Sequence, residues 1–244
     1  MVLCPMAESG FKECQAGILV ILFRELLMKL FMETLKLRAT PVRIFRFLAF
    51  CLCPKNFIVF KFLYIIRHGR TDWNDRHKLQ GQTDIPLNEE GRRMATEAAR
   101  EYADIAFDVC YSSPLCRAKE TAEILLKGRD VPIYYDERLM EMAFGAYEGI
   151  EDSFKIPDCP VNQFFFHPED YREPAGGGES TYDLMARTGG FLEEVAYPLM
   201  AEGKNVLIVG HGAMNMSIVV QVRKLPVADF WKTGIKNCKL IQLV

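Results

Sequence analysis

The sequence predicts an α/β fold, a three-layer α/β/α sandwich built around a largely parallel sheet. Two observations lead to this fold class. Short apolar runs rich in β-branched and aromatic residues, such as KFLYII (61–66) and NVLIV (205–209), are typical of strands buried on both faces. Helix-length segments separate these runs along residues 61–244. Such an alternation is typical of a parallel sheet with helices packed against it.

Each predicted element depends on a local signal. Asn88 can cap a helix, and Glu89 and Glu90 follow it where negative charge suits the helix dipole. Residues 149–178 are rich in Pro, Phe and acidic side chains without a sustained period, so we expect a loop or lid there. In chain order, we expect strands at 61–66, 105–111, 131–135, 205–209 and 239–243, and helices at 89–102, 115–127, 179–201 and 213–222.

The composition excludes some classes of partner and hides an asymmetry. The 244 residues include 30 basic and 32 acidic side chains, a formal charge of -2, which gives no reason to expect a nucleic-acid partner. Residues 1–60 nevertheless carry eight Lys or Arg and four Glu, whereas residues 61–244 are net acidic. The eight cysteines lie in a chain large enough to fold without disulfides, so we expect reduced thiols and a cytoplasmic protein.

Residues 1–60 form a basic and apolar N-terminal extension, and residues 61–244 a single domain. Within the extension, charged residues fall on one stripe of a predicted amphipathic helix at 17–37, and no apolar run is long enough to cross a membrane. One interpretation is a helix that contacts an anionic membrane surface. We favour the alternative, an appendage or translated upstream stretch outside the natural domain, because the segment has no feature of a domain of its own.

Two histidines follow predicted strands in the same way. Arg67-His68-Gly69 ends the first strand, and Gly210-His211-Gly212 ends the NVLIV strand. Ligands of parallel sheets bind at the carboxyl ends of the strands. One His-Gly pair after a strand is usually a turn with a satisfied histidine, but two such pairs predict a shared site.

A third strand end adds a cation. Arg117 lies in the first turn of the helix after the strand at 105–111, where a positive charge is unfavourable unless it holds an anion. Arg67 and Arg117, together with His68 and His211, would then form a cationic pocket in an acidic domain. A phosphoryl group suits this pocket because guanidinium groups bind its oxygens in pairs.

A neutral imidazole in such a pocket can attack phosphorus and form a phosphohistidine that water later cleaves. This route needs one group that protonates the leaving oxygen and later activates water. Glu141 is the candidate because it follows the third predicted strand among apolar neighbours, and Glu137 and Glu148 are alternatives. The sequence has no metal-ligand spacing, so we expect neither a metal nor another cofactor.

Six motifs resemble, in order and spacing, the histidine phosphatase superfamily, also called phosphoglycerate mutase-like. They are RHGRTDWN (67–74), LQGQTDIPLNEEG (79–91), YSSPLCRAKETA (111–122), ERLMEMAFGAYEG (137–149), GGGES (176–180) and VGHGAMN (209–215). The resemblance covers residues 61–244 and implies the phosphoglycerate mutase-like fold and chemistry that requires no metal.

The resemblance also implies roles for particular residues. His68 would be the phosphorylated nucleophile and Glu141 the general acid and base. The phosphoryl oxygens would be held by Arg67, Arg117, His211, Asn74 and the Gly212 N–H, and the substrate would be contacted by Gln80 and Gly81. Arg70 stands where the family more often has Glu or Gln, which leaves its effect on substrate choice open.

Within the family, the sequence favours a phosphatase for a small phosphomonoester, either of broad specificity or similar to α-ribazole phosphate phosphatase. A phosphoglycerate mutase, the alternative, needs extra cations and a dry lid, yet residues 142–178 contain only Lys155 and Arg172 as Lys or Arg. A non-catalytic phosphate-binding protein would have lost the nucleophile or the acid. The run Phe164–Phe166 predicts either an aromatic mouth or simple packing of the lid.

Overall fold

The computed structural model describes residues 61–244, so the extension at 1–60 and its predicted helix at 17–37 lie outside the described residues. One five-stranded sheet organises the described part, in the order β3-β2-β4-β1-β5. The strands are β1 (Leu63–Arg67), β2 (Val109–Ser112), β3 (Ile133–Tyr135), β4 (Val206–Gly210) and β5 (Leu240–Gln242). All neighbours are parallel except β5, which runs antiparallel to β1. The predicted, largely parallel sheet is therefore confirmed.

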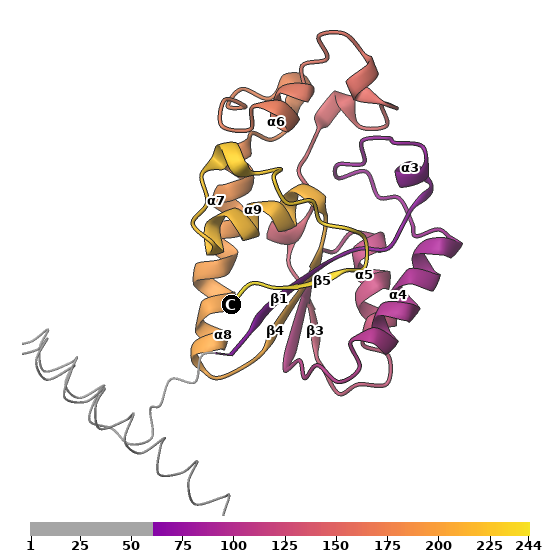
Figure 1. Cartoon of the computed structure of the whole chain (residues 1–244), viewed down its shortest axis with the longest axis vertical. Coiled ribbons are helices and arrows are strands. Elements are labelled where there is room, and N and C mark those ends of the chain that lie inside the picture. The colour runs from indigo at the N-terminus through magenta and orange to yellow at the C-terminus, as the bar shows by residue number, and fades with distance from the viewer. Residues whose placement is uncertain (1–60) are drawn as a thin grey trace, which may run out of the picture. The chain divides into compact units, whose positions relative to one another are not determined.

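Helices cover both faces of this sheet (Figure 1), which completes the predicted three layers. On one face lie α4 (Glu89–Glu101) and α5 (Cys116–Leu125). On the other lie α7 (Thr181–Phe191), α8 (Tyr197–Ala201) and α9 (Gly212–Val222). Asn88 caps α4 as predicted, since its side chain accepts a hydrogen bond from Gly91 N.

Two hydrophobic cores follow from the alternation of side chains along the central strands. In β1, Leu63 and Ile65 belong to the core under α7 and α9, whereas Tyr64 and Ile66 belong to the core under α4 and α5. All four side chains are buried. Full burial of one such side chain contributes about 1.5–3 kcal/mol, so β1 is stabilised from both sides and holds its carboxyl end rigidly.

Most predicted bounds differ from the structure by one or two residues, and two elements depart further from their prediction. The strand expected at 105–111 begins only at Val109, because the preceding residues form a turn that Asp108 fixes by bonding with Asn205. The helix expected at 179–201 begins after the Ser180 cap and contains a π turn at Leu192–Ala196. Pro198, which cannot donate a backbone hydrogen bond, follows this turn and accounts for the interruption.

The predicted lid region contains short helical pieces without a long period. They include α6 (Asn162–Phe166) and the 3₁₀ turns Ser153–Lys155 and Ala175–Gly177, and a four-residue helix, α3 (Asp72–Asp75), follows β1. None of the helices between residues 61 and 244 is long and apolar enough to span a membrane. The four cysteines of this part, Cys110, Cys116, Cys159 and Cys238, are free thiols.

Candidate active site

The pairing of β1 with β4 explains why the two His-Gly pairs form one site. Arg67 lies opposite Gly210 in the sheet, and His68 N donates to Gly210 O over 2.9 Å. The two histidines that follow therefore lie side by side, with their ring centroids 5.1 Å apart. The parallel register thus brings together two segments that are more than a hundred residues apart in the chain.

His68 is held as a neutral imidazole with one ring nitrogen engaged. Its Nδ1 lies 2.6 Å from Gly69 O, so Nδ1 carries the proton and the lone pair is on Nε2. The ring is buried, and burial together with the charges of Arg117 and Arg67 holds the pKa of His68 well below its usual range. A neutral ring with a free Nε2 is the form that can act as a nucleophile.

The backbone around His68 is equally fixed. Gly69 N donates to Thr121 Oγ1 over 3.0 Å, and Asn237 Nδ2 donates to His68 O over 2.7 Å. A Cβ at Gly69 would come within 2.4 Å of Gly91 O, so only glycine fits against the start of α4. The backbone of His68 is therefore fixed by α4, α5 and the segment before β5.

Nitrogen atoms without a protein partner surround His68. Arg117 is fully buried, and its terminal nitrogens donate to Thr83 O and Gly81 O, which leaves Nε free. Arg67 donates to Ile235 O, and its buried Nε is likewise unpartnered. Both ring nitrogens of His211 are buried without a partner. Buried donors without a protein acceptor are costly, so this cluster is suited to an anion with several oxygens.

The pKa values of these groups reflect their burial. Desolvation, with the charges of Arg117 and Arg67, lowers the pKa of His211 well below its usual range, so the ring is neutral at pH 7. Burial also lowers the pKa of the Arg67 and Arg117 guanidinium groups, while Glu141 opposes that shift in both. With both histidines neutral, the positive charge of the pocket comes from Arg67, Arg117 and Lys78, which also lines it.

Glu141 faces the same pocket, but its carboxylate is bound to the start of α9. Its Oε2 accepts hydrogen bonds from Gly212 N and Ala213 N, at 2.9 and 3.2 Å. Its Oε1 accepts from Met142 N and Met214 N, at 3.0 Å each. The Gly212 N–H, which the family resemblance assigns to a phosphoryl group, donates instead to Glu141. Such an arrangement ties the Glu141 loop to α9 and places a negative charge where it compensates the dipole of that helix.

A partly buried ion pair positions the loop that carries Glu141. Arg187 donates to the backbone carbonyls of Arg138, Met140 and Glu141, at 2.6, 2.8 and 3.1 Å. Its guanidinium also binds Glu179, whose Oε2 accepts from Ala143 N. Glu179 belongs to the GGGES motif, but no sequence signal identified Arg187, which lies mid-helix in α7.

The two alternative acids have other surroundings. Glu148 accepts hydrogen bonds from the backbone of Gln82, Thr83 and Phe144, so it joins two loops of the site. A Cβ at Gly81 would lie 2.0 Å from Glu148 Oε1, and Gly81 has a positive φ of 55°, so glycine is required there. Glu137 is exposed in a 3₁₀ turn outside the pocket.

The remaining predicted contacts also lie at the pocket, a cavity of about 210 Å³. Gln80 Oε1 is buried without a partner. Asn74 Oδ1 accepts from Thr71, in the capping box of α3, which leaves its Nδ2 as the group available to a ligand. The cavity is lined by Arg67, His68, Asn74, Lys78, Leu79, Gln80, Gly81, Arg117, Glu141, Phe144, Phe165, Gly212, Ala213 and Trp231.

The three phenylalanines of the lid have three different surroundings. Phe164 is fully buried among aromatic rings that include Phe144 and Trp231. Phe165 is partly buried and lines the cavity, whereas Phe166 is 65% exposed. Phe165 therefore fits the interpretation of an aromatic mouth, and Phe164 fits that of lid packing.

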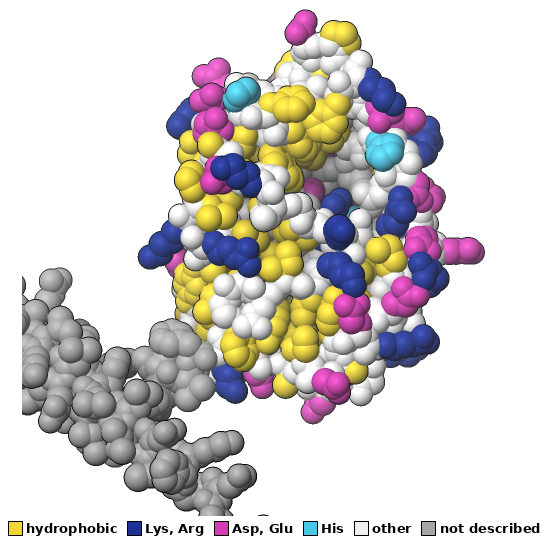
Figure 2. Space-filling model, in the orientation of Figure 1, with side chains coloured by type: hydrophobic (Ala, Val, Ile, Leu, Met, Phe, Trp, Pro, Cys, Tyr) yellow, Lys and Arg dark blue, Asp and Glu magenta, His cyan; other side chains and the backbone are white. Residues whose placement is uncertain are grey.

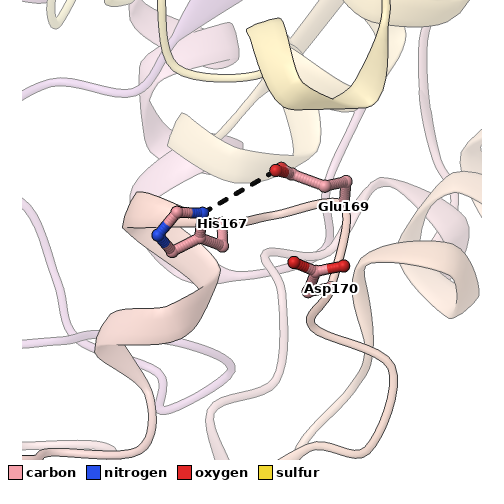
Figure 3. A group of neighbouring side chains, drawn as sticks. All are labelled: His167, Glu169 and Asp170. Atoms are coloured by element: carbon pink, nitrogen blue, oxygen red, sulfur yellow. Dashed lines mark ion pairs between the residues drawn. The ribbon is translucent and has the colours of Figure 1, made fainter.

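The other two histidines lie outside this 210 Å³ cavity, the inner pocket. His77 is exposed in a left-handed turn after α3. His167 follows α6, where its Nδ1 lies 3.8 Å from Glu169 Oε1 (Figure 3). His167, Glu169 and Asp170 could together hold a metal ion, since one ligand atom of each lies within 4.8 Å of the others. All three are partly or fully exposed, and none lines the pocket.

Comparison with known proteins agrees with this geometry. The uncharacterized phosphatase PhoE of Bacillus subtilis is 36% identical over 160 residues, 65% of this chain and 75% of that protein. A 2,3-bisphosphoglycerate-dependent phosphoglycerate mutase of Gloeobacter violaceus is 32% identical over 182 residues, 72% of this chain and 82% of the mutase. The solved structure of YhfR from Bacillus stearothermophilus has a TM-score of 0.68 and 31% identity, and covers 75% of this chain and 90% of that one.

A family model gives the broadest match. The model of the histidine phosphatase superfamily, branch 1, matches residues 63–244, the whole of the sheet and its helices. Its members include phosphatases and mutases, which share phosphoryl transfer. The chain belongs to the histidine phosphatase superfamily.

Proposed function

We propose that the chain is a phosphomonoester hydrolase that acts through a phosphohistidine at His68 on a small phosphorylated metabolite and needs no metal. In the first step, His68 Nε2 forms a bond to phosphorus while the ester P–O bond breaks, and Glu141 protonates the leaving oxygen. In the second, Glu141 takes a proton from water as water attacks phosphorus, and the P–N bond electrons return to the ring.

The observation that carries this proposal is the neutral His68 with its lone pair on Nε2, facing unpartnered nitrogens of Arg67, Arg117 and His211. These nitrogens are suited to the charge that develops on the transferring phosphoryl group. Glu141 acts in this scheme only after it leaves the N–H groups of α9, because four hydrogen bonds occupy both of its oxygens.

The lid supports hydrolysis over mutase chemistry. Lys155 is an exposed side chain paired with Asp152, and Arg172 lies over the Tyr182 ring and bonds its hydroxyl. Neither residue lines the inner pocket. A lid that adds no cation over the site gives a phosphoglycerate no hold from that side, which favours hydrolysis.

Phosphorus NMR separates the two activities in one experiment. The protein is incubated, in excess chelator, with 3-phosphoglycerate plus a trace of 2,3-bisphosphoglycerate, and in parallel with 4-nitrophenyl phosphate. We expect inorganic phosphate from the nitrophenyl ester, together with a phosphohistidine on His68 after rapid acid-free quenching. Conversion to 2-phosphoglycerate that outpaces phosphate release would establish the mutase, and activity lost with chelator would contradict metal independence.

A further inference from the structure

The chain between Ile235 and Cys238 runs beside the carboxyl end of β1, where the site begins. Cys238 N donates to Arg67 O over 2.9 Å, and Arg67 Nη1 donates to Ile235 O over 3.1 Å. Asn237 forms an isolated parallel bridge with Arg67, whereas β5, directly after it, pairs with β1 in the antiparallel sense. The chain therefore reverses its direction against β1 at the residues that contact the site.

The reversal depends on a backbone conformation that is rare for its residue type. Cys238 has a φ of 54°, in the left-handed region. A side chain is disfavoured there because its Cβ comes close to the following carbonyl oxygen, so glycine usually occupies such positions. Cys238 is held in this conformation by its burial in the core under α4 and α5. Strain of this kind is concentrated at functional sites, which directs attention to the residue before it.

That residue, Asn237, places its side-chain amide against two consecutive carbonyl groups. Its Nδ2 lies 2.7 Å from His68 O and 3.5 Å from Gly69 O. Both neighbours are acceptors, so the nitrogen of the amide, with its two N–H groups, is the atom that faces them. The shorter contact is a full hydrogen bond, and the longer one is at the outer limit of hydrogen bonding. One side chain thus restrains the peptide group between His68 and Gly69.

The carbonyl of Gly69 decides where the His68 ring carries its proton. His68 Nδ1 donates to Gly69 O over 2.6 Å, which leaves the lone pair on Nε2. Gly69 has no side chain to restrain its backbone, and Thr121 holds only its N–H. If the carbonyl turned away, the ring proton could move to Nε2, the nitrogen that attacks in the proposed reaction. The position of the ring proton therefore depends on the restraint that Asn237 provides.

Asn237 lies beside the site but outside the hydrophobic cores. It is half-buried and belongs to neither core cluster. Together with Arg67 and Asn74 it lines a cavity of about 690 Å³ next to the inner pocket. Figure 2 shows a hollow in the molecule with Lys and Arg side chains along one side of it. Replacement of Asn237 should therefore disturb the backbone of His68 more than the packing of the fold.

We infer that Asn237 is a positioning residue for His68, which holds the Gly69 carbonyl toward Nδ1 and thereby keeps the lone pair on Nε2. The inference rests on the proposed function, in which Nε2 attacks phosphorus. Asn237 acts in it only through the backbone of the nucleophile. Its loss should lower kcat and leave the affinity for a phosphoryl group unchanged, because the arginines of the pocket keep their own contacts.

The test is ¹⁵N NMR of protein labelled at its four histidines, since the spectrum distinguishes a ring nitrogen that bears a proton from one that bears a lone pair. The signals of His68 are those missing from His68→Ala. In wild type at pH 7 we expect His68 with its proton on Nδ1 alone. Asn237→Leu keeps a neutral side chain of similar size without a donor, and here we expect both tautomers. Asn237→Ala should show a smaller change, because water can enter and donate to His68 O.

Kinetics of the same variants show whether the tautomer matters for turnover. Asn237→Leu should lower kcat for 4-nitrophenyl phosphate about tenfold, as expected for a misplaced nucleophile. The inhibition constant of inorganic phosphate should stay unchanged. Asn205→Ala is the matched control, since the Asn205 side chain bonds Phe62 N and Ala106 O at the opposite end of β1. It should lower stability in urea and leave both the tautomer and kcat as in wild type.

The spectra separate this inference from the proposed function, because they need no turnover. If Asn237→Leu mixes the tautomers but wild type hydrolyses no ester, the hydrolase proposal fails and the positioning role holds. If His68 keeps its proton on Nδ1 alone in Asn237→Leu, the inference is overturned, even where His68→Ala abolishes hydrolysis. A tenfold loss of kcat in Asn205→Ala overturns it as well. Should urea unfolding show that Asn237→Leu is not folded, the spectrum of Asn237→Ala decides in the same way.

Discussion

The strand ends and the loops of the site differ in how their polar atoms are satisfied. Arg67, His68 and His211 lie at the carboxyl ends of β1 and β4, and each has a ring or guanidinium nitrogen free for a ligand. Glu141 lies on a loop, and both of its oxygens already accept backbone hydrogen bonds. The rigid sheet can hold unsatisfied donors toward a ligand. The loop instead uses the Glu141 carboxylate to bind the start of α9.

The largest effect is expected at the strand end. His68→Ala removes the nitrogen that we propose attacks phosphorus, so kcat/KM for 4-nitrophenyl phosphate should fall by at least about 10⁴, as for other catalytic nucleophiles. His167→Ala, at an exposed histidine outside the pocket, is the matched control and should change kcat/KM by less than about twofold. If kcat/KM fell by tenfold or less in His68→Ala, His68 would not be the nucleophile.

The next effect tests whether the loop carboxylate has a second role as the acid. In Glu141→Gln, kcat for an alkyl phosphate should fall by about 10²–10³, the contribution of a general acid. The loss for 4-nitrophenyl phosphate should be smaller, because nitrophenolate leaves without a proton. The variant should also lose about 1–3 kcal/mol of unfolding free energy, since an amide cannot accept all four backbone N–H bonds.

Glu148→Gln is the control for this difference between the alkyl and the nitrophenyl ester. Glu148 joins the loops at Gln82 and Phe144, so its loss should lower stability and reduce turnover of both esters alike. A leaving-group dependence in Glu148→Gln, with none in Glu141→Gln, would exchange the roles of the two carboxylates.

The buried histidines should make the strand ends sensitive to acid. Folding lowers the pKa of His68 and His211, so below pH 6.5 the unfolded chain binds protons that the folded chain does not. Stability should therefore fall as the pH drops below 6.5, by up to about 1.4 kcal/mol per pH unit for each histidine. Urea unfolding of wild type and His211→Asn at pH 7.5 and 5.5 measures this.

The unfolding free energy of His211→Asn should depend less steeply on pH than that of wild type. The control His167→Asn should match wild type because His167 is exposed. Equal pH dependence in His211→Asn and wild type would mean that His211 binds a proton as readily folded as unfolded. In the same range, kcat/KM should persist below pH 6.5, since His68 stays neutral there.

The same contrast explains which parts could be predicted from the sequence. Strands β1 and β4 are buried runs that end in His-Gly, so their side chains had to share one sheet edge, and Arg117 followed from its unfavourable place in a helix. The sequence could not show that Glu141 binds the start of α9, because that contact joins residues about 70 positions apart through loop geometry. It also could not separate Phe164 from Phe166, since a five-residue helix decides which ring is buried.

The smallest effect tests whether the loop needs its own support. Arg187→Ala removes three hydrogen bonds to the backbone around Glu141 and leaves Glu179 without its ion-pair partner. We expect about a tenfold loss of kcat for an alkyl phosphate and a smaller loss for 4-nitrophenyl phosphate, because Arg187 acts only through Glu141. Arg187→Lys keeps the charge but not the planar group that bonds three carbonyls, so it should restore stability more than kcat. If Arg187→Ala lowers kcat equally for both substrates, then Arg187 supports only the fold, and the loop holds Glu141 in place without this arginine.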